Sequence, residues 1–113
     1  MNMIKREKIC FVIMGFGKKQ DPYSMRTIDL DESYNKIINT AVTQSGWQCI
    51  RADQIVESTI IDKSMYALLH EADLVIADIT TLNPNAMYEL GVRHTMRPST
   101  TIIIGAGLKE HTI

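Results

Sequence analysis

The chain has 113 residues, of which 45% are hydrophobic and 22% are charged, and its formal net charge is −1. This length and composition fit one globular domain spanning residues 1–113. The near-neutral charge gives no electrostatic basis for binding nucleic acid or an anionic membrane, and the chain lacks the apolar run of about 18 residues that a spanning helix needs. Two cysteines without metal-ligand spacing, and an N-terminus without a cleavage site, predict a cytoplasmic protein.

Four short apolar segments predict buried β-strands. The first is KICFVIM at 8–14, a continuous run of β-branched and aromatic residues that is typical of a strand buried on both faces. The others lie at 47–51, 74–77 and 100–104, where the last reads TTIII. Between the first strand and the first helix, residues 15–30 hold two glycines and a proline without a period, which predicts a long loop.

Three amphipathic helices are predicted between the strands. The first begins with Asp31 as its N-cap, has one apolar face toward the sheet, and ends at Gly46. Its predicted buried residues are Tyr34, Ile37, Ile38, Ala41 and Val42. The second is capped by Ser58 or Thr59 and buries Ile61, Met65, Leu68, Leu69 and Ala72. The third starts at Asn83-Pro84 and ends at Arg97-Pro98.

The order β-α-β-α-β-α-β predicts a parallel sheet with right-handed crossovers and helices on both faces. We therefore expect a flavodoxin-like or Rossmann-like three-layer α/β/α fold whose strands, in chain order, are arranged 2-1-3-4. Such a fold normally continues with one more strand and helix. We expect the chain to be either a shortened domain or a piece of a longer protein.

Ligands of open parallel sheets bind outside the carboxyl ends of the strands. Four segments of this chain are predicted at that edge: the turn Gly15-Phe16-Gly17, then Asp53, then Asp78 with the loop to Asn85, and finally the residues 105–107. The loop at 15–30 also carries Lys18, Lys19, Tyr23 and Arg26. These side chains are either phosphate contacts on a closing lid or solvated loop residues.

Asp78 and Glu89 are the main catalytic candidates. Helical spacing places Ala86, Met87 and Leu90 on the face toward the sheet, and Glu89 on a flank one turn after Asn85, which is within hydrogen-bonding reach. Two neighbouring acids at a sheet edge can act as nucleophile and as proton donor or substrate anchor. The alternative is that Glu89 is a solvated helix residue and Asp78 a turn former. No metal site is expected, because the three histidines lack ligand spacing.

The stretch ADLVIADITTLNPNAMYELGVRH, residues 72–94, resembles the signature of the nucleoside 2-deoxyribosyltransferase-like group, which is similar in fold to bacterial TIR-type NAD hydrolases. The strand and turn CFVIMGFG also resembles the start of that group, so that the likeness covers about residues 9–104. The resemblance implies that Glu89 acts at the anomeric carbon of a nucleoside and that Asp78 holds the sugar or base. It implies that Gly15, Phe16 and Gly17 line the substrate pocket.

One departure from the family pattern affects the expected substrate. Asn83-Pro84-Asn85 stands where the better-studied transferases have a turn of the Asp-x-Gly-Thr type. Asparagine side chains still donate hydrogen bonds to sugar hydroxyls, but a ribosyl substrate such as NAD or a nucleotide becomes as plausible as a deoxynucleoside. Asn83, Asn85, Asp53 and Arg26 are the further substrate-binding candidates.

Two hypotheses about function follow. The first is an enzyme, hydrolase or transferase, that cleaves or transfers the N-glycosidic bond of a nucleoside, nucleotide or NAD, with no bound cofactor and with NAD as a substrate rather than a coenzyme. The second is a non-catalytic, TIR-like module that binds a nucleotide or assembles with itself within a larger signalling or defence protein. Under either hypothesis we expect a small-molecule nucleotide ligand, no nucleic acid, no membrane and a homo-oligomer.

Overall fold

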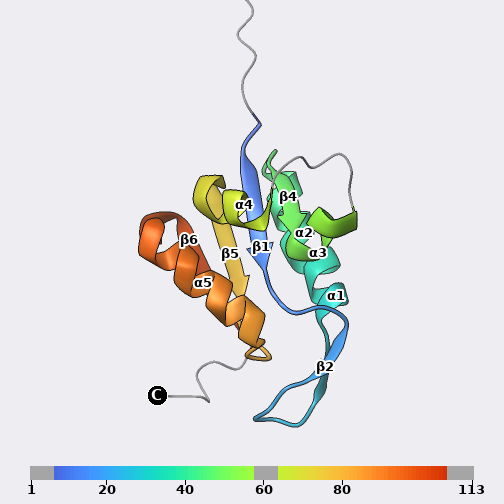
Figure 1. Ribbon diagram of the computed structural model, residues 1–113. Coiled ribbons are helices and arrows are strands. Elements are labelled where there is room, and N and C mark those ends of the chain that lie inside the picture. The colour runs from blue at the N-terminus through green and yellow to red at the C-terminus, as the bar shows by residue number, and fades with distance from the viewer. Residues whose placement is uncertain (1–6, 58–63, 107–113) are drawn as a thin grey trace, which may run out of the picture.

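Four parallel strands form the central sheet of the computed structural model, which describes residues 7–57 and 64–106 (Figure 1). They are β1 (Ile9–Ile13), β4 (Gln48–Arg51), β5 (Leu74–Asp78) and β6 (Thr101–Ile104). Their spatial order is β4-β1-β5-β6, all pairs parallel, with Cys10 of β1 paired with Cys49 on one side and with Leu74 on the other. The predicted α/β class and strand arrangement are therefore confirmed.

Helices cover both faces of this sheet. Because successive strand side chains point to opposite faces, Phe11 and Ile13 pack on one side and Cys10 and Val12 on the other. The first side is covered by α3 (Ala52–Glu57), α4 (Met65–Glu71) and α5 (Pro84–Met96). The second is covered by one continuous helical segment made of α1 (Leu30–Ser33), the π-helical η1 (Tyr34–Ile38) and α2 (Asn39–Gln44). None of the described helices is long and apolar enough to cross a membrane.

The predicted loop at 15–30 is instead a β-hairpin. Its strands β2 (Lys18–Gln20) and β3 (Thr27–Asp29) pair antiparallel and form a separate two-stranded sheet, which projects beyond the carboxyl ends of the parallel strands in Figure 1. Asp21 closes the turn, because its carboxylate accepts hydrogen bonds from the Ser24 hydroxyl and backbone N–H. Strands of three residues are too short to leave a readable alternation in the sequence.

The first helical segment begins earlier and winds more widely than predicted. Asp29, not Asp31, is the N-cap, with its carboxylate accepting from the Glu32 N–H. The predicted residues Ile37 and Ala41 are exposed, whereas Tyr34, Ile38 and Val42 are buried. The π turn explains this error, because its wider winding aligns positions four residues apart and turns position 37 outward. Gly46 ends the segment with a φ of 84°, as predicted.

Of two further helices, one was not predicted and the other has a different N-cap from the predicted one. The strand β4 leads directly into α3, which the sequence analysis missed. Ser64 caps α4 by accepting from the Ala67 N–H, and Leu68, Leu69 and Ala72 are buried as predicted while Met65 is half-buried. The predicted caps Ser58 and Thr59 and the predicted core residue Ile61 lie outside the described residues.

The helix α5 follows the prediction at both ends. The Asn83 side chain accepts from the Ala86 N–H at 3.0 Å, Pro84 occupies the first turn, and the helix ends at Met96 before Arg97-Pro98. Ala86 and Leu90 are buried as predicted, but Met87 is 39% exposed. Arg93 completes the buried face instead and is fully inaccessible to solvent.

A further 3-10 turn, η2 (Pro98–Thr100), joins α5 to β6.

Candidate functional site

An open pocket of about 330 Å³ lies where β1 and β4 end and α5 begins. This is the carboxyl edge of the parallel sheet, where ligands of such folds bind, and the volume falls in the usual range for small-molecule sites. Five predicted site residues line it: Phe16, Asp53, Asn83, Asn85 and Glu89. The remaining lining residues are Met14, Lys19, Ala52, Met65 and Ala86. The topology therefore collects side chains from four separate segments of the chain.

The two glycines of the turn after β1 border this pocket without lining it. A Cβ added to Gly15 would lie 3.1 Å from Leu30 Cδ1 and 3.4 Å from Asn83 Nδ2, so the turn passes close to the helix cap of α5. Gly17 has a φ of 71°, which L side chains adopt only with strain, and its N–H donates to Asp31 Oδ1 at 3.0 Å. These glycines allow the chain to bend tightly from β1 into the hairpin beside the pocket.

Glu89 is a half-buried carboxylate on the second turn of α5. Its Oε2 atom is buried and has no hydrogen-bond partner among the described residues, so the predicted bond from Asn85 is not made to that oxygen. Burial raises the pKa of the Glu89 carboxyl above its ordinary value. An unpaired acid that lines a pocket is available to a ligand, and it differs from the solvated helix residue of the alternative interpretation.

Asp78 lies on the other face of the sheet from Glu89. Side chains of β5 alternate, so Asp78 follows Leu74 and Ile76 toward the first helical segment, whereas α5 packs on the opposite face. Asp78 lines a smaller hollow of about 170 Å³ together with Thr80, Ile104 and Gly105. Its Oδ1 atom accepts hydrogen bonds from the backbone N–H and the hydroxyl of Thr80. The predicted pair of neighbouring acids is therefore not formed, and the contacts of Asp78 are those of a turn former.

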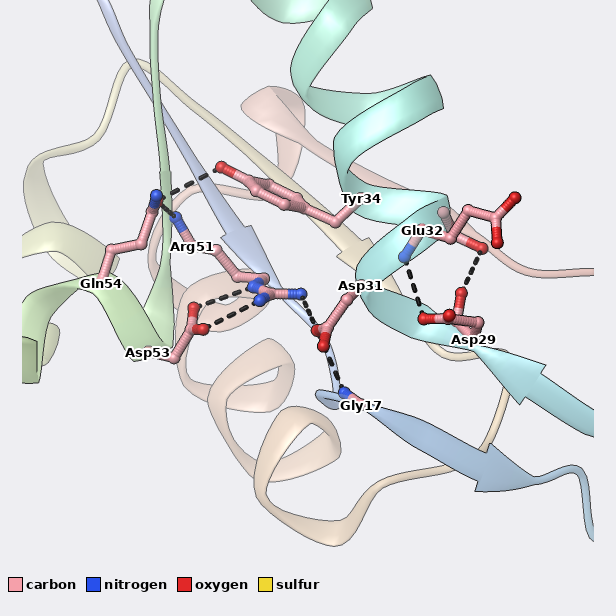
Figure 2. Close-up of polar contacts among 9 residues, drawn as sticks. Gly17, Asp29, Asp31, Glu32, Tyr34, Arg51, Asp53 and Gln54 are labelled. Carbon is pink, nitrogen blue, oxygen red and sulfur yellow. Dashed lines mark hydrogen bonds and ion pairs between the residues drawn. The ribbon is translucent and has the colours of Figure 1, made fainter.

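Arg51, at the end of β4, was missed by the sequence analysis and organises one side of the pocket (Figure 2). Its Nε and Nη2 atoms donate to the two oxygens of Asp53, each at 2.8 Å, and its Nη1 atom donates to Asp31 Oδ1 at 2.8 Å. Arg51 is only 7% exposed. Such a fork-shaped pair fixes the plane of a carboxylate as well as its position.

Aromatic rings enclose the same guanidinium. Its carbon lies 4.9 Å from the centre of the Phe16 ring and 4.6 Å from the centre of the Tyr34 ring. Asp31 in turn accepts from the Gly17 N–H, and this bond, followed by the Arg51 contact, holds the pKa of the Asp31 carboxyl below its ordinary value. Arg51 thus connects the turn after β1, the start of α1 and the start of α3. The only sequence signal for it was an arginine two residues before an acid at a predicted strand end.

The cationic residues of the hairpin are divided between the pocket and solvent. Lys19, which was considered with Lys18 as a phosphate contact, lines the pocket. Arg26, a predicted substrate-binding residue, is exposed on the hairpin and does not line it.

Arg93 fixes the helix that carries Glu89. Its Nη1 atom donates to the carbonyl oxygens of Leu69 and Ala72, both at 3.0 Å, which are backbone acceptors left over at the end of α4. Its other nitrogens donate to Thr100 and Thr101 near the start of β6. A single buried side chain therefore ties α5 to α4 and to the edge strand.

Within residues 7–57 and 64–106, no three His, Cys, Asp or Glu side chains are grouped to hold a metal ion. Comparisons with protein-family models, with curated proteins and with solved structures found no match for the chain. The assignment of a function therefore depends on the pocket itself.

Proposed function

We propose that the protein cleaves or transfers the N-glycosidic bond of a nucleoside, nucleotide or NAD, with Glu89 acting at the anomeric carbon. The observation that carries this proposal is the Glu89 carboxylate, which lines the pocket at the carboxyl edge of the sheet and has one buried oxygen that no described residue hydrogen-bonds. A carboxylate close to the sugar suits a reaction with an oxocarbenium-like transition state.

The proposed reaction has two steps, in which the Glu89 carboxylate first forms a bond to the sugar and is then released from it. The ionised carboxylate attacks C1′ of the sugar, the C1′–N bond breaks, and its electron pair leaves with the base. A purine or pyrimidine base takes up a proton from water, whereas the nicotinamide of NAD leaves as a neutral molecule and needs no proton. Water or a second base then attacks C1′ and loses a proton, and Glu89 is released as the carboxylate. The pocket offers the remaining requirements: an aromatic face at Phe16 for stacking on a base, and amides at Asn83 and Asn85 for sugar hydroxyls.

The topology and the sequence motif support the same assignment. The resemblance of residues 72–94 to the nucleoside 2-deoxyribosyltransferase-like group puts the family's glutamate at position 89, and the flavodoxin-like arrangement agrees with the strand order β4-β1-β5-β6. Asp78 takes no part in this proposal, because its carboxylate faces the smaller hollow. The second acid of the pocket is Asp53.

An activity screen tests the proposal. The wild-type protein is incubated at high concentration with the common ribonucleosides, deoxynucleosides and NAD, and free base or nicotinamide is measured by chromatography. We expect release from at least one compound and a loss of at least a hundredfold in Glu89→Gln. Because burial raises the Glu89 pKa, release should fall as the pH is lowered, with a midpoint above the usual glutamate value of about 4.3. Release by Glu89→Gln at the wild-type rate would refute the assignment.

A second candidate function is self-assembly without catalysis. The observation that favours it is a set of exposed apolar side chains on α5 and on the same face of the edge strand β6, namely Met87, Tyr88, Met96 and Ile103. Light scattering over a range of protein concentrations tests it: assembly that Tyr88→Ser abolishes, together with nucleotide binding and no base release, would favour this function over the first.

A further inference from the structure

The acid Asp53 faces the same pocket as Glu89 but is held very differently. Both of its oxygens accept from the Arg51 guanidinium at 2.8 Å, whereas one oxygen of Glu89 has no partner in the part of the chain that the structure describes. We propose that Asp53 binds the 2′- and 3′-hydroxyls of the substrate sugar, and that the pocket therefore selects ribosyl over 2′-deoxyribosyl compounds. This inference rests on the proposed function, because it names the sugar that the Glu89 pocket accepts.

The hydrogen-bonding capacity of Asp53 allows this role. An ionised carboxylate has about four acceptor positions, and the two bonds from Arg51 use one on each oxygen. The Asp53 side chain is 32% exposed and lines the pocket, so the remaining positions can be reached by a ligand. A ribose cis-diol presents two neighbouring O–H donors that match the two oxygens, and a 2′-deoxyribose lacks one of them.

The surroundings of Arg51 hold the Asp53 carboxylate in one orientation. The guanidinium is confined between the Phe16 and Tyr34 rings and bonded to Asp31 on its remaining side. A pre-oriented acceptor loses little conformational entropy when a ligand binds. Arg51 is therefore a positioning residue, which acts on the sugar only through Asp53.

The place of Asp53 in the fold agrees with this assignment. It follows β4, the second parallel strand of the chain, which is a direct neighbour of β1 in the sheet. In dinucleotide-binding α/β sheets, the acid at the end of the corresponding strand accepts a hydrogen bond from the ribose 2′-hydroxyl. Here the chain places a carboxylate at the same position and adds an arginine that fixes it.

The test is equilibrium binding in the Glu89→Gln background, which prevents turnover. Isothermal titration compares adenosine, guanosine and cytidine, each with its 2′-deoxy counterpart. We expect at least one ribonucleoside to bind and to bind at least about tenfold more tightly than its deoxy form. A further Asp53→Asn change should reduce that ratio to within about threefold, and Arg51→Lys, which loses the fork geometry, should also lower it. The matched control is Glu32→Gln, an exposed acid in an ion pair with Lys36, which should leave the ratio unchanged.

The ligands supply a second, independent measurement if Asp53→Asn lowers stability. Replacing adenosine with 3′-deoxyadenosine removes one donor of the diol and should weaken binding to the Asp53-intact protein as the 2′-deoxy change does. Equal binding of ribo and deoxy forms, no binding of any ribonucleoside, or a ribose preference that survives Asp53→Asn would each overturn the inference. A ribose preference in binding without base release from the wild type would leave the inference standing and refute the proposed function. Base release without a sugar preference would support the proposed function and refute the inference about Asp53.

Discussion

Replacing Arg93 with methionine should destabilise the protein strongly, because the change removes a buried cation and leaves its acceptors unpaired. The side chain is fully inaccessible and donates to the carbonyl oxygens of Leu69 and Ala72. Each buried acceptor left unsatisfied costs about 1–3 kcal/mol, so these two alone predict a loss of about 4 kcal/mol. A chain of 113 residues has a total stability of roughly 6–17 kcal/mol. The loss should lower the melting temperature by about 15 °C.

Urea denaturation followed by the fluorescence of Trp47 measures this effect, since the chain contains one tryptophan and it packs beside the core under the first helical segment. The matched control is Arg97→Met on the same helix end. Among the described residues, the Arg97 side chain makes one long hydrogen bond, 3.4 Å, to the carbonyl oxygen of His70. The loss of this bond should cost less than about 1 kcal/mol. A loss below 1 kcal/mol in Arg93→Met, or equal losses in both variants, would refute the assignment of Arg93 as the anchor of α5.

Three further predictions concern the pocket and its turn. Glu89→Gln should be more stable than wild type at neutral pH, and melting curves should show this advantage shrinking as the pH falls toward 4. The reason is that the pKa of Glu89 is higher in the folded than in the unfolded protein, so the stability of the wild type decreases with rising pH. A stability advantage that does not change with pH would count against a buried acid at this position. Lys19→Ala should weaken the binding of adenosine 5′-monophosphate about three- to tenfold relative to that of adenosine. Lys18 does not line the pocket, so Lys18→Ala should not have this effect. Equal effects of the two variants on binding of the monophosphate would exclude a phosphate contact by Lys19. Gly17→Ala should lower the free energy of unfolding by about 1–2 kcal/mol, because Gly17 has a φ of 71°. Gly91→Ala, on the open face of α5, should raise the free energy of unfolding by up to about 1 kcal/mol. Urea denaturation measures both, and an unchanged stability in Gly17→Ala would contradict the strained turn.

The parts of the fold predicted correctly from sequence are those set by local chemistry. Continuous apolar runs located all four parallel strands, and Asn83-Pro84 located the start of α5, because a cap and a proline act within one turn of the chain. The alternation of strands and helices then led to the observed strand order. These features need no knowledge of distant contacts.

Most features that were missed depend on where the folded chain brings side chains together, and one is a local irregularity of a helix. The partners of Arg51 are an acid twenty residues earlier and an acid two residues later, and only the folded chain shows that they share one guanidinium. Asp78 and Glu89 are eleven residues apart, but the alternation of β5 sends Asp78 to the opposite face of the sheet from α5. The π turn at Tyr34–Ile38 left no signature in the apolar spacing, so the exposure of Ile37 was not foreseen.

The most direct test of the central claim is to measure base release by Glu89→Gln and Asp78→Asn side by side at saturating substrate. Both changes replace a carboxylate with an amide of the same shape, and the two residues line different hollows. If the Glu89 pocket is the active site, Glu89→Gln loses at least a hundredfold in kcat while Asp78→Asn stays within about tenfold of wild type. Full activity in Glu89→Gln, or a greater loss in Asp78→Asn, would contradict the account.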